Sequence, residues 1–543
     1  MNTEMPLLKV ENLSVPLPEG LERQYAVSDI NIHLEPREIL CVVGESGSGK
    51  SMLANAIMGL LPYYIKPSGG RILFRGDDLL RMSEGEIRNE RGRSLAMVFQ
   101  EPLSALNPLM TIGEQISEVM RVHGEGTAAS RKSRVLELLD YVGLPQPEIL
   151  QYAYPFRLSG GQRQRVMIAM ALVLEPAILI ADEPTTALDV TTQAQILELI
   201  CRIQREKGMA VLFITHDFGV VADIADRVVV MEQGRIVEQG NAEDVLERPS
   251  HPYTRQLISS IPYRRSNRPA LDGKETPLLT VHGLCKTYSS SGGWFAPDRT
   301  TVAVDDVSFA IRRGETLGLV GESGSGKSTI GRCVLRLAEA DGGEVIFDGT
   351  DILPILEDAF RPYRSRMQMI FQDPFSSLNP RHSIGRILME GPMVNGMSRE
   401  RAGMKARELL NMVGLDPSSF SRYPHEFSGG QRQRVGIARA LSLDPEFLVA
   451  DEAVSALDVS VQAQVLVLLQ RLQRQLGLAI LFITHDLRVA AQICDRVAVM
   501  HQGKLVEQGP TAKLFEHPAH EYTKGLIAAI PGSGWEPPVL AVS

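Results

Sequence analysis

The sequence predicts two similar α/β domains in tandem, each built around a largely parallel sheet. Three observations carry this prediction. The chain has 543 residues, enough for several domains that each bury a core of their own. Strand-like apolar runs alternate with helical patterns in both halves, which is typical of parallel sheets covered by helices. Finally, the same short motifs occur twice in the same order, as expected of an internal repeat.

The repeat also predicts where the domains begin and end. Lys327 follows Lys50 by 277 residues, whereas Glu452 follows Glu183 by 269, so length changes only in some segments. We expect domain one at residues 5–262 and domain two at 277–531. A polar stretch with no apolar periodicity, residues 263–276, is the expected linker. A helical pattern around 134–139 predicts a helical segment inserted into the α/β core of each domain.

Each half contains one glycine-rich motif of the pattern G-x-x-x-x-G-K-[ST]. In such a P-loop, backbone N–H groups cradle phosphates, the Lys reaches the outer phosphates and the Ser hydroxyl can ligate Mg²⁺. Apolar runs at 39–43 and 317–320 precede the motifs, as buried strands leading into the loop would. We therefore expect two sites for a nucleoside triphosphate, formed by Gly44, Glu45, Ser46, Gly47, Ser48, Gly49, Lys50 and Ser51 and by Gly321, Glu322, Ser323, Gly324, Ser325, Gly326, Lys327, Ser328 and Thr329.

Acidic residues end a second apolar run in each half. Asp182 and Glu183 follow one such run, and Asp451 and Glu452 follow the other. Ligands of open α/β sheets bind at the carboxyl ends of strands. We expect the aspartates to ligate Mg²⁺ with the P-loop serines, and the glutamates to polarise the water that attacks the phosphate.

Two further polar residues follow apolar runs in each half. His216 and His485 each lie 33 residues after the glutamate of their half, which favours a role at the γ-phosphate. Gln100 and Gln372 are placed to sense Mg²⁺ or the attacking water. We predict the catalytic set to be Gln100, Glu183, His216, Gln372, Glu452 and His485, and the metal set to be Ser51, Gln100, Asp182, Ser328, Gln372 and Asp451.

A Ser-Gly-Gly-Gln motif opens an amphipathic helix in each half. A serine cap and two glycines make a helix N-terminus that an anion can approach closely. We expect this motif to be a second phosphate-binding element of each domain, formed by Ser159, Gly160, Gly161 and Gln162 and by Ser428, Gly429, Gly430 and Gln431.

With Ala-Leu-Asp at 187–189 and 456–458, these motifs resemble two ATP-binding cassette (ABC) ATPase domains fused in one chain. The resemblance implies P-loop NTPase domains, each with a RecA-like α/β core, the inserted helical subdomain and a small antiparallel β subdomain. It also implies that ATP binds between the P-loop of one domain and the Ser-Gly-Gly-Gln motif of the other. Adenine would stack on Tyr25. The second domain has Val302 there, so Tyr288, Trp294 and Phe295 remain alternatives.

The segments after each cassette, about 232–262 and 501–531, resemble the tails of ATPases of peptide, nickel and opine importers. Fused chains of this type resemble the glutathione and microcin C importer ATPases. The resemblance implies an ATPase for dipeptides or oligopeptides, glutathione or opines. Its partners would be two transmembrane permeases and a periplasmic solute-binding protein, at the cytoplasmic face of the bacterial inner membrane. Some relatives carry an iron–sulfur cluster, but no cysteine lies in either tail, so none is expected.

Composition excludes several other classes of protein. A net charge of −9 argues against nucleic acid as the principal partner. The five cysteines form no C-x-x-C pair, so neither disulfides nor zinc are expected. No signal peptide is predicted, and no apolar run approaches the roughly 20 residues of a membrane span. A soluble tandem-cassette ATPase acting on ribosomes or nucleic acid is the alternative, but the short linker and acidic charge count against it.

Overall fold

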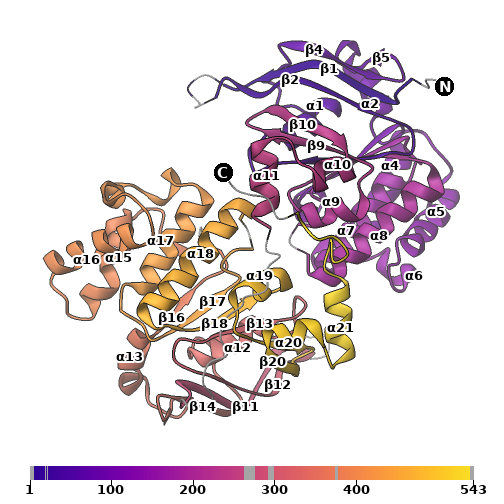
Figure 1. Cartoon of the computed structure of the whole chain (residues 1–543). Coiled ribbons are helices and arrows are strands. Elements are labelled where there is room, and N and C mark those ends of the chain that lie inside the picture. The colour runs from indigo at the N-terminus through magenta and orange to yellow at the C-terminus, as the bar shows by residue number, and fades with distance from the viewer. Residues whose placement is uncertain are drawn as a thin grey trace. The chain divides into compact units, whose positions relative to one another are not determined.

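The computed structural model describes residues 5–18, 20, 23–186, 188–261, 276–290, 299–373, 377–455 and 457–538. The chain forms two compact units (Figure 1). Unit 1 comprises Met1–Ile261 together with Pro531–Ser543, and unit 2 comprises Pro262–Ile530. Nearly all of the expected linker lies outside the described residues, as do Ala187, Trp294, Phe295 and Ala456.

The core of unit 1 is a six-stranded sheet in the order β10-β9-β3-β8-β7-β6. Five strands are parallel and the edge strand β10 is antiparallel to β9. The strands are β3 (Ile39–Val43), β6 (Leu95–Val98), β7 (Ile178–Asp182), β8 (Ala210–Thr215), β9 (Arg227–Glu232) and β10 (Arg235–Asn241). The predicted largely parallel α/β sheet is therefore confirmed.

Apolar clusters lie on both faces of this sheet, which explains why its strands are continuously apolar in sequence. Successive side chains of β3 alternate between them: Cys41 and Val43 belong to one cluster, and Leu40 and Val42 to the other. All five residues of β3 are buried. The loops at the strand ends are thus held by a rigid, fully covered sheet.

A second sheet of four antiparallel strands, in the order β2-β1-β4-β5, completes the α/β part of unit 1. It is the small antiparallel subdomain that the family resemblance implied. Its strands are β1 (Leu8–Pro16), β2 (Tyr25–Leu34), β4 (Gly69–Phe74) and β5 (Asp77–Asp78).

Helices cover the sheets of unit 1 and form the predicted insertion between β6 and the helix that follows the Ser-Gly-Gly-Gln motif. The inserted helices are α3 (Pro102–Ala105), α4 (Ile112–Val122), α5 (Ala128–Tyr141) and α6 (Pro147–Leu150). The remaining helices are α1 (Lys50–Ile57), α2 (Glu84–Glu90), α7 (Gly160–Leu172), α8 (Val190–Lys207), α9 (Phe218–Ile224), α10 (Ala242–Glu247) and α11 (Pro252–Ser259).

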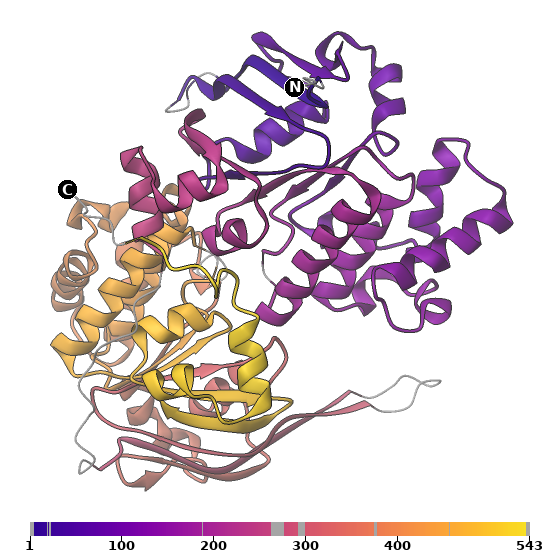
Figure 2. The same ribbon diagram turned by 45° about the vertical axis from the view of Figure 1, so that its right-hand side comes forward.

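Unit 2 repeats this architecture. Its sheets have the orders β16-β17-β18-β13-β19-β20 and β12-β11-β14-β15. Figure 2 shows β11 and β12 as a long two-stranded ribbon. The strands are β11 (Leu279–Ser290), β12 (Arg299–Ile311), β13 (Thr316–Val320), β14 (Gly342–Phe347), β15 (Thr350–Asp351), β16 (Met367–Ile370), β17 (Phe447–Asp451), β18 (Ala479–Thr484), β19 (Arg496–His501) and β20 (Lys504–Pro510).

The helices of unit 2 also match those of unit 1 in order. They are α12 (Lys327–Val334), α13 (Glu357–Arg366), α15 (Ile384–Val394), α16 (Arg399–Met412), α17 (Gly429–Leu441), α18 (Val459–Leu476), α19 (Leu487–Ile493), α20 (Thr511–Glu516) and α21 (Glu521–Ala528). Within the described parts of the chain, no helix is long and apolar enough to cross a bilayer.

The segment after α21 belongs to unit 1 and is hydrogen-bonded to helices of its first part. The Gly532 N–H donates to Asp223 Oδ2 at 2.8 Å, and the Trp535 indole N–H donates to Glu247 Oε1 at 2.8 Å. Trp535 also packs against the main apolar cluster of unit 1. Gly532 has a φ of +70°, and a Cβ there would lie 2.7 Å from the Cα of Gly219, so only glycine allows this approach. Gly219 and Asp223 belong to α9, which starts two residues after His216.

Candidate functional site

In each unit, the predicted P-loop, catalytic and metal-ligating residues meet at one edge of the six-stranded sheet. Strands β3, β8, β7 and β6 are neighbours and parallel, so their carboxyl ends lie side by side. The P-loop follows β3 and His216 follows β8. Asp182 ends β7, and Gln100 lies two residues beyond β6. The equivalent strands of unit 2 bring its residues together in the same way.

The glycines at both ends of the first P-loop segment are required by its path. Gly44 has a φ of +152°, and a Cβ there would lie 2.2 Å from the carbonyl oxygen of Met231. Gly49 caps α1 with a φ of +104°, and its Cβ would lie 2.6 Å from the oxygen of Ala26. No residue with a side chain fits either position. Glycine at both positions therefore allows the loop to wrap closely around the start of α1.

The P-loop lysines point into their own loops. Lys50 is 5% exposed, and its Nζ donates to the carbonyl oxygens of Gly44 at 2.7 Å and Glu45 at 2.9 Å. Lys327 donates to Gly321 at 2.8 Å and to Glu322 at 2.7 Å. A buried ammonium at a helix N-terminus is an electrostatic match for phosphate oxygens.

The predicted metal ligands lie together in both units. Ser51 Oγ donates to Asp182 Oδ1 at 3.1 Å, and Ser328 Oγ donates to Asp451 Oδ1 at 2.9 Å. Burial raises the pKa of both aspartates, and the hydrogen bond from each serine offsets part of that rise. A cation beside these carboxylates would favour their charged form. Paired hydroxyl and carboxylate oxygens are hard donors of the kind Mg²⁺ prefers, so the residues fit this ion.

Glu183 is the centre of a hydrogen-bonded cluster. Its Oε2 atom accepts from Gln100 Nε2 at 3.0 Å and from Thr186 Oγ1 at 2.9 Å, and lies 3.3 Å from Nδ1 of His216. The backbone of Glu183 has a φ of +46°, a conformation that costs a non-glycine residue about 1–3 kcal/mol and is frequent at functional sites. The structure therefore joins three of the predicted residues through one carboxylate.

The equivalent cluster surrounds Glu452. Its Oε2 atom accepts from Gln372 Nε2 at 2.6 Å, and its Oε1 atom lies 3.2 Å from Nδ1 of His485. The φ of Glu452 is also +46°. Both copies keep the strained backbone and the contacts of the glutamate with glutamine and histidine, so neither site has lost its acid–histidine pair.

The environment favours a charged pair in each cluster. Burial alone would raise the pKa of Glu183, but the hydrogen bond and charge of His216 lower it to about 2. Burial would lower the pKa of His216, yet the carboxylate of Glu183 raises it. The pKa of Glu452 is lowered and that of His485 raised for the same reasons. These pKa shifts favour a carboxylate facing an imidazolium in each pair.

Sequence reasoning missed the hydroxyl residue of each cluster. Thr186 lies three residues after Glu183, and Ser455 lies three residues after Glu452, where its Oγ donates to the glutamate's carbonyl oxygen at 3.1 Å. The signal was present as a hydroxyl side chain at the same spacing in both copies. By contrast, nothing in the sequence indicates that the two glutamates adopt a positive φ.

The Ser-Gly-Gly-Gln motifs form capping boxes at the starts of α7 and α17, with serine and glutamine side chains bonded to each other's backbone N–H. The two glycines of each motif differ. A Cβ on Gly161 would lie 2.4 Å from Thr192, and one on Gly430 would lie 2.3 Å from Val461. A Cβ on Gly160 would meet only Leu188, at an ordinary 3.5 Å. Packing within the unit therefore requires the second glycine but not the first.

Tyr25 lines an open cavity of about 480 Å³ beside the first P-loop. Arg23, which shares this cavity, donates to the carbonyl oxygen of Gly47 at 2.7 Å. In unit 2, Val302 on β12 is 55% exposed and pairs with Thr287, whereas Tyr288, 44% exposed, pairs with Thr301. Adenine stacking on Tyr25 is compatible with this arrangement and stays a prediction.

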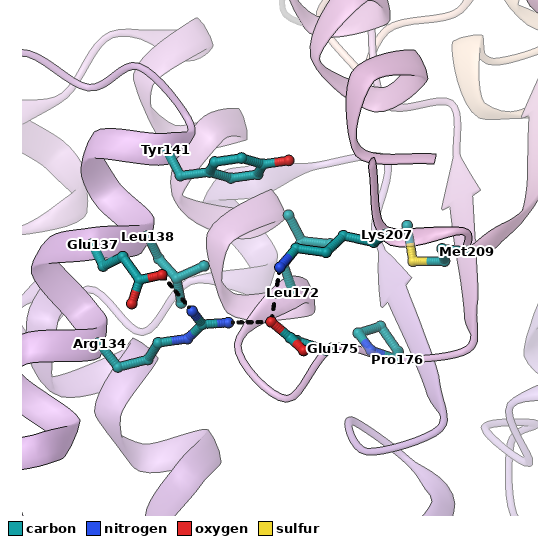
Figure 3. Close-up of a pocket in the computed structure, with 9 residues that line it drawn as sticks. All are labelled: Arg134, Glu137, Leu138, Tyr141, Leu172, Glu175, Pro176, Lys207 and Met209. Carbon is teal, nitrogen blue, oxygen red and sulfur yellow. Dashed lines mark hydrogen bonds and ion pairs between the residues drawn. The ribbon is translucent and has the colours of Figure 1, made fainter. Parts of the chain in front are cut away.

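A second cavity of unit 1 lies at the amino ends of β7 and β8, the opposite edge of the sheet (Figure 3). Its volume is about 40 Å³, far too small for a nucleotide. Figure 3 shows Arg134 paired with Glu137 and Glu175, and Lys207 paired with Glu175. These ion pairs connect the inserted helix α5 to the segments that lead into β7 and β8. We interpret this cavity as a structural feature and not as a ligand site.

Comparison with known proteins identifies the family. The family described as ABC transporter matches residues 27–186 and 304–455, which hold both P-loops and both glutamates. The chain belongs to the ABC transporter family. As an ABC ATPase it binds and hydrolyses ATP. The family described as oligopeptide/dipeptide transporter, C-terminal region, matches residues 237–289 and 506–536 of this ABC ATPase.

Individual relatives cover almost the whole ABC ATPase chain. A "Glutathione import ATP-binding protein GsiA" of Salmonella choleraesuis is 46% identical over 97% of this chain and 89% of its own length. A "Peptidoglycan transport ATP-binding protein YejF" of Agrobacterium fabrum is 48% identical over 97% of both chains. A solved bacterial ABC transporter cassette, MJ0796, is 31% identical over 43% of this chain and 98% of its own, with a TM-score of 0.40.

Proposed function

We propose that this ABC ATPase energises an importer of peptides or peptide-like solutes, of the dipeptide, oligopeptide, glutathione or opine class. The observation that carries the proposal is the tail that follows each cassette, because it matches the oligopeptide/dipeptide transporter C-terminal region twice. The names of the relatives, which refer to glutathione import and to peptidoglycan transport, support the same class. They give no support to the alternative of an ATPase acting on ribosomes or nucleic acid.

In the proposed mechanism, ATP lies between the P-loop of one unit and the Ser-Gly-Gly-Gln motif of the other, as in the family that the sequence resembles. One site would use the first P-loop with Ser428–Gln431, and the other the second P-loop with Ser159–Gln162. The space beside Gly160 supports this proposal. Packing within unit 1 would tolerate a Cβ there, so a glycine at this position is consistent with close approach of a phosphate from outside the unit. Closure on ATP and opening after hydrolysis would drive the permeases.

The contacts of Lys50, Glu183 and His216 support the catalytic roles proposed for them. Lys50 holds positive charge within the P-loop, where it would stabilise the charge that develops on the phosphates. Glu183 is already ionised beside Gln100, so it can orient a water for attack on the γ-phosphate. His216 would exchange its contact with Glu183 for one with the γ-phosphate, which frees the carboxylate for the water. Unit 2 offers the same groups.

Magnesium would be held by Ser51 and Asp182, with Gln100 nearby, and by Ser328 and Asp451 with Gln372. When bound, the ion would neutralise charge on the β- and γ-phosphates. No group of three His, Cys, Asp or Glu side chains suitable for a metal occurs within the described ranges. The ion would therefore depend on phosphate oxygens and water for its remaining ligands.

Two transmembrane permeases and a periplasmic solute-binding protein are the proposed partners, at the cytoplasmic face of the bacterial inner membrane. The test is purification of the tagged chain from native membranes, followed by uptake of labelled dipeptide, oligopeptide and glutathione in a strain that lacks it. Co-purification of permeases and loss of peptide-class uptake are expected. Co-purification with ribosomes, with unchanged uptake of every labelled solute, would contradict the proposal.

A further inference from the structure

Each importer-type tail contacts the P-loop of its own unit through a tyrosine. The backbone N–H of Glu45 donates to the hydroxyl of Tyr253, on α11, at 3.2 Å. The N–H of Glu322 donates to the hydroxyl of Tyr522, on α21, at 3.3 Å. The partners lie about 200 residues apart in sequence, and the contact is the same in both copies.

The peptide group that receives this contact is also held by the P-loop lysine. The carbonyl oxygen of Gly44 and the N–H of Glu45 belong to one planar peptide unit. Lys50 Nζ donates to that oxygen at 2.7 Å, while the N–H donates to Tyr253. The peptide unit between Gly321 and Glu322 is held likewise by Lys327, at 2.8 Å, and by Tyr522. The tail and the lysine therefore fix opposite ends of the same peptide plane.

The tyrosine is itself anchored in the unit. Glu238 on β10 accepts from the N–H groups of Ser250 at 2.7 Å and His251 at 3.1 Å, which ties down the turn before α11. His251 Nδ1 then accepts from the N–H of Tyr253 at 3.2 Å and caps the helix. These bonds connect the edge strand of the sheet, through the tail, to the P-loop.

Unit 2 contains the same chain of hydrogen bonds. Glu507 on β20 accepts from the N–H groups of Ala519 at 2.8 Å and His520 at 3.0 Å. His520 Nδ1 accepts from the N–H of Tyr522 at 3.1 Å. The repetition indicates that histidine and tyrosine at this spacing have a common structural purpose in both tails.

The two tyrosine rings are held differently. Tyr253 is 8% exposed and belongs to the main apolar cluster of unit 1. Tyr522 is partly exposed, and its ring stacks on that of His501 with centroids 4.0 Å apart. Removing the hydroxyl alone leaves both modes of ring packing in place, so the hydrogen bond can be tested separately from the packing.

We propose that Tyr253 and Tyr522 are positioning residues for ATP binding, which makes each importer-type tail a part of its own unit's P-loop. The inference rests on the proposed binding of ATP at the two P-loops. Without the hydroxyl, the peptide between Gly44 and Glu45 loses the tail's hydrogen bond at its N–H end, so the loop samples conformations that do not bind phosphate. Loss of affinity for ATP is then expected without a matching loss of turnover.

The test is the double variant Tyr253→Phe with Tyr522→Phe in the full chain. We expect the KM for ATP and the dissociation constant of a fluorescent ATP analogue to rise about three- to tenfold, the effect of one net hydrogen bond per site. The kcat should stay within about twofold of wild type, because no group that touches the reacting atoms changes. Tyr522→Phe alone, with its partly exposed ring, provides a variant that is easier to fold.

Two controls separate the possible outcomes. Tyr141→Phe removes another hydroxyl hydrogen bond of unit 1, to Glu206 at 2.6 Å, beside the cavity of Figure 3, and should leave the KM unchanged. Lys50→Ala with Lys327→Ala should abolish binding of the analogue, and retained binding would contradict the P-loop assignment itself. Abolished binding in the lysine variant, with wild-type KM in the tyrosine variants, would overturn only the role of the tyrosines. A fall in thermal stability with no change in KM would also overturn it.

Discussion

The carboxylate of Glu183 lies 3.3 Å from Nδ1 of His216, although 33 residues separate them in sequence. Parallel pairing of β7 and β8 produces this contact, because the two residues follow neighbouring strands at the same edge. The pair at Glu452 and His485, 3.2 Å apart, forms in the same way from β17 and β18. We take these two pairs as the centres of the hydrolytic sites.

The isosteric change Glu183→Gln with Glu452→Gln should preserve ATP binding and lower kcat by at least about 100-fold, because the groups that orient the water lose their charge. Steady-state phosphate release and equilibrium binding of ATP measure the two effects. Glu198→Gln, on the exposed face of α8, is the matched control and should hydrolyse ATP normally. Wild-type turnover in the double variant would remove the glutamates from the mechanism.

The acid–histidine pairs predict a pH dependence of stability in the absence of nucleotide. The pKa of Glu183 is lowered from 4.5 to about 2, so its contribution is present above pH 4.5 and is lost as the pH falls toward 2. The pKa of His216 is raised from 6.5, so its contribution is present below pH 6.5 and is lost as the pH rises through the raised value. The pair should stabilise the chain fully only between these limits.

The corresponding experiment measures thermal unfolding at a series of pH values. It compares wild type with the double variant that carries both His216→Asn and His485→Asn. The difference in unfolding temperature should be largest between pH 4.5 and 6.5 and should shrink at alkaline pH. His123→Asn, which changes a histidine at the end of α4, controls for the loss of an imidazole elsewhere. A difference that grows with rising pH would contradict the charged pair.

The two glycines of each Ser-Gly-Gly-Gln motif should respond differently to substitution. Gly161→Ala and Gly430→Ala introduce a methyl group within 2.4 Å and 2.3 Å of side chains on α8 and α18. They should lower the free energy of unfolding by about 1–3 kcal/mol, as overpacking does. Gly160→Ala and Gly429→Ala should leave stability unchanged but reduce ATPase activity. Full activity in these first-glycine variants would count against phosphate binding at the motif.

The C-terminal segment should stabilise α9 and α10, the helices that its hydrogen bonds reach. Trp535→Ala removes the hydrogen bond to Glu247 and the packing of the indole on unit 1. Amide hydrogens of α9 should then exchange faster, whereas those of the equivalent helix α19 in unit 2 should not change. Tyr63→Ala, at a side chain that is 91% exposed, provides the aromatic control. Equal exchange of α9 in wild type and in Trp535→Ala would show that the segment does not support this helix.

Local sequence signals predicted a large part of this structure and of its sites. The P-loops were recognisable because glycines occur where the backbone has a positive φ and because a buried strand precedes them. The meeting of Gln100, Asp182 and His216 followed from one general rule, that ligands bind at the carboxyl ends of parallel strands. No strand order was needed for that prediction.

The remaining features depend on tertiary contacts that leave no local pattern. The hydrogen bond between Glu45 and Tyr253 joins residues 208 positions apart, and neither residue type indicates from the sequence that the other is its partner. The positive φ of Glu183 results from packing around a non-glycine residue, so composition does not reveal it. Trp535 packs against the main apolar cluster from a short segment rich in proline and glycine. This segment has no helical or strand periodicity from which the contact could be predicted.

The most direct test of the account combines one P-loop lesion with one lesion in a Ser-Gly-Gly-Gln motif. Glutamate at Gly160 or Gly429 suits the start of a helix but repels phosphate. Lys50→Ala with Gly429→Glu places both lesions in one proposed site, whereas Lys50→Ala with Gly160→Glu damages both sites. Occlusion of labelled ATP by the purified chain is the measurement. The first variant should retain one competent site and the second none; equal occlusion by the two variants, or the reverse order, would contradict sites shared between the cassettes.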